Sequence, residues 1–245
     1  MQTNITLHIQ PDYESLSLTA ARLFARAVRM RPTGVFGFAT GSTPTGMYAE
    51  LVKMSTKGEV DFSQVTAFNL DEYMGLSGDH HQSYQYFMAK NLFNNVGLPI
   101  PNRNIPSGTT TNPTEECIAY EKKIIDSGGI DLQILGIGNN GHIGFNEPAD
   151  IFAGPTAHVP LAPETIQANA RFFDNPDQVP KFAISMGIQT IMMSKAIMLL
   201  ASSDTKAGIL YDALRGPITP KIPASVLQLH RNVVVVVDKA AGKFL

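Results

Sequence analysis

The sequence contains a single cysteine, Cys117, among its 245 residues. One cysteine excludes an intramolecular disulfide and a cysteine-based zinc site, and a free thiol is typical of a reducing cytosol. Residues 1–10 lack a basic patch followed by an apolar stretch, so we expect no signal peptide there. The longest purely apolar runs, such as Val233–Val237, suit a buried strand and are too short to span a bilayer. We therefore expect a cytoplasmic protein without a membrane partner.

The sequence also lacks a large excess of charge of either sign. Its 19 basic and 21 acidic residues give a net charge of −2. Such a balance provides no global attraction for nucleic acid or for an anionic membrane, so any anionic ligand must be held by local groups. With 44% hydrophobic and 16% charged residues, the composition is that of a globular protein.

Apolar runs that suit strands alternate with helical patterns along most of the chain. The expected strands are Ile5–Ile9, Val35–Ala39, Val65–Leu70, Leu132–Ile137, Ala196–Ala201 and Val233–Val237. Helical periodicity is expected after Pro11-Asp12, around Met47–Met54, and over Ser83–Phe93, Thr114–Ile125 and Asp204–Leu214. Continuous apolar strands separated by helices predict an α/β fold, with a mostly parallel sheet covered by helices on both faces. We expect one domain over residues 1–245.

The stretch 151–180 differs from the rest because it is rich in proline and weakly periodic. It could be an ordinary long connection. Long irregular segments of compact domains are more often lids or binding loops, so we expect an active-site lid here.

The turn after the second expected strand has the composition of an anion site. Gly41 permits a tight turn, Ser42 and Thr43 offer hydroxyls, and Thr43-Pro44 suits the cap and first position of a helix. Free N–H groups at a helix N-terminus attract phosphate, although a helix cap without a ligand remains an alternative. No lysine follows in P-loop spacing, which disfavours a nucleotide. Lys206 and Arg171 are candidate cations for such a phosphate.

A carboxylate, Asp71, follows the third expected strand, in the segment Phe68-Asn69-Leu70-Asp71-Glu72-Tyr73. Ligands bind beyond the carboxyl ends of strands in an open parallel sheet. Asp71 could act there as a general base, an amine binder or a metal ligand, or it could cap a helix. Neighbouring strand residues point in opposite directions, so Asp71 and Glu72 are not expected to share a site.

A loop of glycines and asparagines after the fourth expected strand carries His142 and Glu147. A histidine polarised by a carboxylate can move protons near neutral pH, although a structural histidine is the alternative. The other histidines lack metal-ligand spacing, so we expect no catalytic metal.

Several ordered motifs together resemble the glucosamine-6-phosphate deaminase family. They are Thr40–Pro44, Phe68–Tyr73, Gly138–Pro148, Arg171–Asp174 and Leu227–His230, spread over nearly the whole chain. The resemblance implies a modified Rossmann-like sheet and a cofactor-free enzyme in amino-sugar catabolism. It would convert glucosamine-6-phosphate and water to fructose-6-phosphate and ammonium.

The resemblance also implies roles for individual residues. His142, oriented by Glu147 and Asn140, opens the pyranose ring, and Asp71 then moves a proton from carbon 2 to carbon 1. The phosphate is held by Gly41, Ser42, Thr43, Arg171 and Lys206.

Two departures from the family pattern matter. Many members have Asp where this chain has Asn140, so we expect Asn140 only to orient His142 and Glu147 to do more of the proton relay. Allosteric members carry basic residues where this chain has Ala157 and Val159, with Asp150 nearby, and they extend beyond the equivalent of Leu245. We therefore expect a non-allosteric enzyme and a monomer.

Three alternatives remain open. 6-Phosphogluconolactonases share a similar Gly-His loop, but theirs typically continues with small residues and Leu-Phe-Pro instead of Ile143–Pro148. Galactosamine-6-phosphate is a rival substrate that the sequence does not exclude. A non-catalytic sugar-phosphate sensor of a repressor would need a DNA-binding module, and no basic recognition helix precedes the first strand.

Overall fold

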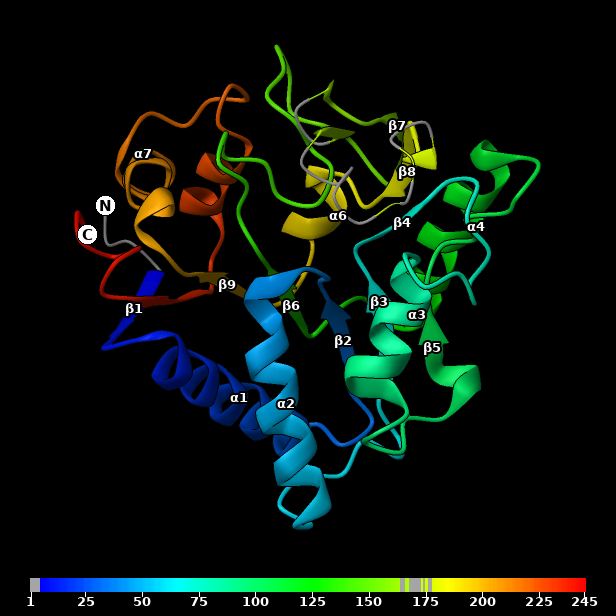
Figure 1. The fold of residues 1–245 in the computed structure, drawn as a ribbon, viewed down its shortest axis with the longest axis horizontal. Helices are drawn as coiled ribbons and strands as arrows, with labels where there is room; N and C mark the ends of the chain where they lie inside the picture. Colours follow the sequence, from blue (N-terminus) through cyan, green and yellow to red (C-terminus); the bar gives the residue numbers. More distant parts are fainter. Residues whose placement is uncertain (1–4, 164–165, 168–172, 174, 176–177) are drawn as a thin grey trace.

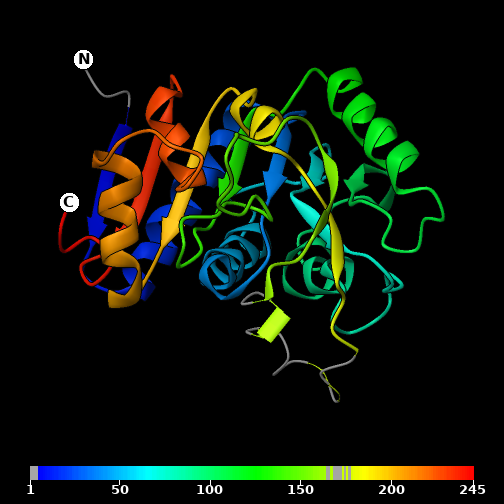
Figure 2. The same ribbon diagram turned by 90° about the horizontal axis from the view of Figure 1, so that it is seen from above.

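Two β-sheets organise the chain in this computed structural model, which describes residues 5–163, 166–167, 173, 175 and 178–245. The larger sheet has seven strands in the order β1-β10-β9-β6-β2-β3-β5, and every neighbouring pair is parallel. The smaller sheet, β4-β8-β7, is antiparallel. Figures 1 and 2 show the long sheet crossing the molecule, with α7 and α4 near its opposite ends.

The strands of the larger sheet are β1 (Ile5–Gln10), β10 (Val233–Asp238), β9 (Ile197–Ala201), β6 (Leu132–Leu135), β2 (Val35–Phe38), β3 (Thr66–Asn69) and β5 (Arg103–Asn104). The strands of the smaller sheet are β4 (Asp71–Tyr73), β8 (Phe182–Ser185) and β7 (Ala157–Pro160). The α-helices are α1 (Tyr13–Met30), α2 (Ser42–Thr56), α3 (Tyr84–Met88), α4 (Pro113–Asp126), α6 (Ile188–Met192) and α7 (Ala207–Arg215). Shorter helical turns are η1 (Ala89–Phe93), η2 (Ile100–Asn102), η4 (Asp204–Lys206) and η5 (Pro223–Leu229).

Helix α1 illustrates how the sequence builds this arrangement. Asp12 caps it by accepting a hydrogen bond from the backbone N–H of Ser15, at 2.8 Å. Its buried stripe includes Phe24, whose ring centroid lies 5.1 Å from that of Phe36 and 5.4 Å from that of Phe38 on β2. Truncating a buried phenylalanine of this kind to alanine costs about 3–5 kcal/mol, so this contact fixes α1 against the sheet.

The expected α/β class, the parallel sheet and its main strands are confirmed, but several boundaries were wrong. The third expected strand divides at Leu70: β3 belongs to the larger sheet, and Asp71 begins β4 of the smaller one. Leu70 joins the two sheets, because its N–H donates to Phe38 O at 3.0 Å and its carbonyl accepts from Met186 N at 2.8 Å. The edge strand β5, between the expected helices Ser83–Phe93 and Thr114–Ile125, was not among the expected strands.

Part of the stretch 151–180, expected to form a lid, is regular structure. Strand β7 pairs with β8 in the register Ala157–Ser185. Residues 164–165, 168–172, 174 and 176–177 of this stretch lie outside the described residues.

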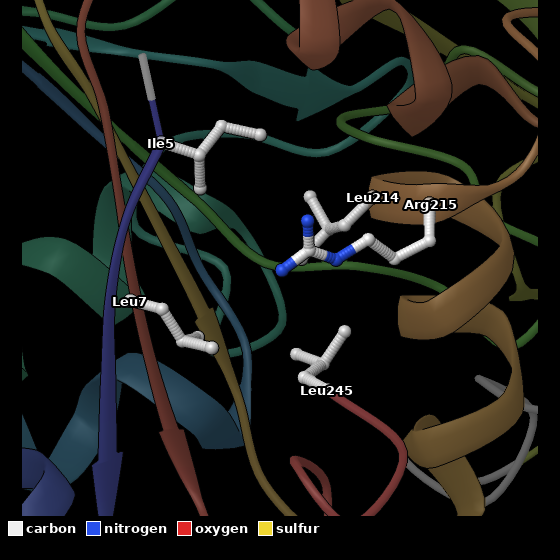
Figure 3. Close-up of a pocket in the computed structure, with 5 residues that line it drawn as sticks. All are labelled: Ile5, Leu7, Leu214, Arg215 and Leu245. Atoms are coloured by element: carbon white, nitrogen blue, oxygen red, sulfur yellow. The ribbon is translucent and has the colours of Figure 1, made fainter. Parts of the chain in front are cut away.

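A small cavity lies near the C-terminal residue, where Ile5, Leu7, Leu214, Arg215 and Leu245 surround about 30 Å³ (Figure 3). A volume of this size is about that of one water molecule in the liquid, so the cavity is far too small for a sugar phosphate. Among the described residues, no helix is both long enough and apolar enough to cross a bilayer.

Candidate active site

The site lies where the strand order reverses. Strands β2 and β6 are neighbours in the larger sheet. Strand β3, which follows β2 in the chain, pairs on one side of them, and β9, the next strand of this sheet after β6, pairs on the other side. The connections that follow β2 and β6 therefore run to opposite sides, and α/β sheets bind ligands at the carboxyl ends of such strands. These two loops carry Gly41–Thr43 and His142.

The turn after β2 presents backbone N–H groups at the start of α2. The cap residue is Gly41, with φ 109°, a conformation that favours glycine, and the helix begins at Ser42. The expectation that Thr43 caps the helix and Pro44 opens it was wrong by two residues, because the positive φ falls on Gly41. No described side chain caps this helix end, so its first N–H groups and its dipole are available to an anion.

Asp71 is a buried carboxylate at the first residue of β4. It is 6% exposed and pairs across the small sheet with Ser185. Burial, together with the adjacent charge of Glu72, raises the pKa of Asp71 to about 8. A carboxyl group with a pKa near the working pH is suited to both taking and returning a proton.

Glu72 makes different contacts from Asp71, as the alternation of side-chain directions along a strand predicts. Its carboxylate accepts hydrogen bonds from the backbone N–H groups of Tyr73, Tyr84 and Gln85 at 2.8–2.9 Å. Two of these donors lie in the first turn of α3, so Glu72 ties β4 to that helix. We did not foresee this role, because no local pattern in the sequence places α3 over β4.

His142 lies in the loop after β6 and packs against Gly138. A Cβ atom at Gly138 would lie 2.3 Å from the His142 ring, so only glycine admits the imidazole there. Nδ1 of His142 is buried and lies 3.4 Å from Oε1 of Glu147, which is an electrostatic contact without hydrogen-bond geometry. Catalytic contacts of this kind are often long before substrate binds.

Asn140 contacts both Glu147 and the backbone of His142. Its Nδ2 donates to Oε2 of Glu147 at 2.7 Å, and its Oδ1 accepts from the backbone N–H of His142 at 3.2 Å. The amide therefore fixes the carboxylate and the loop backbone, and it orients the imidazole through them.

The Asp71 carboxylate and the His142 loop meet at Gly144. A Cβ atom at Gly144 would lie 3.7 Å from Oδ2 of Asp71 and 3.1 Å from Oγ of Ser185. Gly144 has φ 57° and is only two residues from His142. The loop that carries His142 thus passes next to the Asp71 carboxylate.

Lys206 approaches the same loop from the turn after β9. Its Nζ donates to Oδ1 of Asn139 at 2.6 Å, and partial burial lowers its pKa. The turn before it contains Ser203, the one non-glycine residue in the described ranges with a positive φ, 87°. Asp238 holds this strained turn by accepting hydrogen bonds from Ser203 N and from the Ser202 hydroxyl.

Of the expected site residues, Asn140, His142 and Glu147 lie on one loop that passes next to Asp71 on β4, and Lys206 joins this loop through Asn139. Gly41, Ser42 and Thr43 lie at the end of the neighbouring strand β2. Arg171 lies outside the described residues. An apolar cavity of about 340 Å³ opens beside Glu147, between the His142 loop and β7. In the described part of the chain, no cluster of three metal-ligating side chains is found.

The chain is similar to known proteins over nearly its whole length. Residues 13–236 match the family model of glucosamine-6-phosphate isomerases and 6-phosphogluconolactonase. A glucosamine-6-phosphate deaminase from Clostridium perfringens strain 13 is 51% identical over 239 residues, which cover 98% of this chain and 99% of that protein. Another, from Clostridioides difficile strain 630, is 50% identical and covers 96% of this chain and 94% of that protein.

This chain belongs to the glucosamine-6-phosphate deaminase family.

Solved structures of a deaminase and of a lactonase have the same fold as this chain. The structure of a monomeric glucosamine-6-phosphate deaminase is 42% identical and superimposes with a TM-score of 0.94, covering 98% of this chain and 100% of that one. A 6-phosphogluconolactonase from Trypanosoma brucei superimposes with a TM-score of 0.75 at 17% identity and shares the fold. Sequence similarity therefore separates this family member from the lactonases that share its architecture.

Proposed function

We propose that this chain converts glucosamine-6-phosphate and water to fructose-6-phosphate and ammonium. The observation that carries the proposal is the approach of the His142 loop to Asp71 at Gly144. An aldose–ketose isomerisation needs one group near the ring oxygen and one near carbon 2, and His142 and Asp71 are suited to these two roles. The full-length similarity to glucosamine-6-phosphate deaminases supports this substrate.

The phosphate end of the substrate is assigned to the turn after β2 and to nearby cations. Gly41, Ser42 and Thr43 offer N–H groups and hydroxyls at the positive end of α2. Lys206 supplies a charge from the turn after β9, and we assign Arg171 to the same role. Binding the phosphate far from the reacting carbons orients the sugar without taking part in the chemistry.

Ring opening is assigned to His142. The imidazole takes the proton of the anomeric hydroxyl and returns it to the ring oxygen as the bond between carbon 1 and the ring oxygen breaks. Glu147 stabilises the protonated imidazole from 3.4 Å, and Asn140 holds Glu147 in place.

Proton transfer between carbons 1 and 2 is assigned to Asp71. Its carboxylate removes the proton from carbon 2 to give an enolamine, then delivers the proton to carbon 1 to give an imine. Water adds to carbon 2, the carbon–nitrogen bond breaks, and ammonium leaves. The positive amine of the arriving substrate favours the ionised form of Asp71, which burial alone disfavours.

We further propose that the stretch 151–180 closes over the bound sugar and that the enzyme is a cytoplasmic, non-allosteric monomer. The proline-rich composition supports the lid. Ala157 and Val159 on β7 leave no cation there for an anionic effector, and a 42% identical deaminase structure is described as monomeric. The unpaired, buried Cys117 is in keeping with a reducing compartment.

Ammonium release from glucosamine-6-phosphate, measured with and without a chelator, tests the proposal. We expect equal turnover in both and no hydrolysis of 6-phosphogluconolactone. The Asp71→Asn variant should still bind the sugar phosphate but lose at least about 10²-fold in turnover. Lactone hydrolysis without ammonium release would instead favour the lactonase function, and galactosamine-6-phosphate as a parallel substrate tests the epimer preference.

A further inference from the structure

A tyrosine from α1 reaches into the first turn of α2, 29 residues away in the sequence. The Tyr13 hydroxyl lies 2.9 Å from Ser42 O and 3.0 Å from Thr43 O, to which it can donate. It also accepts a hydrogen bond from Gly46 N at 2.9 Å. One phenol hydroxyl thus contacts three backbone groups of the turn that follows Gly41.

These contacts fall in the first turn of α2. In an α-helix the N–H of residue 46 would pair with the carbonyl of Ser42. The Tyr13 hydroxyl contacts both groups, so it binds this pair from outside the helix. Because the carbonyl of Ser42 shares a planar peptide unit with the N–H of Thr43, holding that carbonyl from the α1 side also fixes the direction of this N–H group.

The sequence makes room for this hydroxyl with a glycine. A Cβ atom at Gly46 would lie 2.3 Å from Oγ of Ser17 and 2.9 Å from the Tyr13 hydroxyl. Ser17 is one turn beyond Tyr13 on α1 and is 3% exposed. Figure 1 shows α1 and α2 side by side. A side chain at position 46 would force the two helices apart at the level of the phosphate turn.

We propose that Tyr13 is a positioning residue for phosphate binding, because its hydroxyl fixes the backbone of the Gly41–Thr43 turn in the conformation that receives the anion. The inference rests on the proposed function only in assigning that turn to the phosphate of the substrate. Tyr13 itself does not touch the reacting carbons; it acts through α2.

The Tyr13→Phe variant tests this role because it keeps the ring and removes only the hydroxyl. We expect the KM for glucosamine-6-phosphate to rise about 5- to 20-fold, the range for losing a bonded hydroxyl, while kcat changes less than about twofold. Direct calorimetric binding of inorganic phosphate should weaken by a similar factor. Simple destabilisation would lower the active fraction, and hence apparent kcat, without raising KM.

Two further variants complete the experiment. Tyr211→Phe on α7, where Tyr211 is 47% exposed, is the matched control and should leave KM and phosphate affinity unchanged. Gly46→Ala attacks the same contact from the other helix and should also raise KM, so the test survives if Tyr13→Phe does not fold.

The outcomes separate the inference from the proposed function. If the wild-type protein turns over glucosamine-6-phosphate but Tyr13→Phe or Gly46→Ala keeps its KM and phosphate affinity within about twofold, the role of Tyr13 is refuted and the function stands. If the wild-type protein binds phosphate more tightly than Tyr13→Phe but releases no ammonium, the function is wrong and the inference stands. Absence of phosphate binding by the wild-type protein overturns the inference.

Discussion

The buried carboxylate of Asp71 makes the stability of this protein depend on pH in a predictable direction. Burial raises the pKa of Asp71 from 3.8 to about 8 in the folded chain. Between these values the folded state keeps a proton that the unfolded state has released, so the free energy of unfolding falls as pH rises from about 4 to about 8. Asp71→Asn cannot titrate, and its stability lacks this contribution.

The size of the effect follows from the shift. Each pKa unit corresponds to about 1.4 kcal/mol, so a shift of about four units is worth about 5–6 kcal/mol in full. Most of it develops between pH 5 and pH 9, where Asp71→Asn should gain about 4 kcal/mol in unfolding free energy relative to the wild-type protein. Glu72, whose pKa burial also raises, to about 7, is present in both proteins, and its effect on Asp71 is part of the shift that the substitution removes.

Urea unfolding followed by circular dichroism at half-unit steps from pH 5 to pH 9 measures this difference. Asp212→Asn, on the exposed side of α7, serves as the control and should track the wild-type curve. A constant difference between Asp71→Asn and wild type across this range would show that Asp71 is ionised at low pH in the folded chain. That result would contradict the burial argument and its role as a base poised near neutral pH.

Three other predictions concern activity. For the free enzyme, kcat/KM should rise with pH along an acid limb governed by the pKa of Asp71, about 8, and a limb near pH 4 would mean that the carboxyl is solvated before substrate binds. Gly144→Ala should reduce kcat at least about 10-fold, because the methyl group would contact Ser185 and Asp71 and the residue has φ 57°; unchanged kcat would show that the loop relaxes freely. Lys206→Met should raise KM about 10-fold or more, with a smaller change in kcat. Asn139→Ala should raise KM only a few-fold. Equal KM values for Lys206→Met and wild type would show that the lysine does not bind the phosphate.

The larger sheet could be predicted from the sequence because its strands are continuous apolar runs. Strands such as Val233–Asp238 are buried and strongly β-forming, and they carry their own signal. The small sheet gave no such signal, since β4, β7 and β8 are three or four residues long and mix polar with apolar side chains. Their pairing depends on partners more than 20 residues away.

The reactive side chains of the candidate site could be predicted from the sequence, but the hydrogen bonds that hold them in place could not. Asp71 and His142 follow apolar strands in segments rich in polar residues or glycine, which marked them as candidates. The capping of α3 by Glu72 and the hold of Tyr13 on α2 involve backbone groups of elements distant in the sequence, which no local spacing encodes. The position of the α2 cap was misjudged because a left-handed glycine competed with a good capping threonine.

Three segments that form the site are held in the same way. In each of them, a carboxylate accepts hydrogen bonds from neighbouring polar groups. Glu72 anchors the strand that bears Asp71, Asp238 anchors the turn that leads to Lys206, and Glu147 is held by Asn140 beside His142. Hydrogen bonds to charged groups contribute about 1.5–3 kcal/mol each, which is enough to hold the strained φ of the Lys206 turn. The groups left to meet the substrate are a proton-accepting carboxyl for its positive amine and a lysine and N–H groups for its negative phosphate. The two charges at opposite ends of the substrate therefore select its orientation in the site, and an unphosphorylated amino sugar, which lacks the negative end, would lose that selection as well as binding energy.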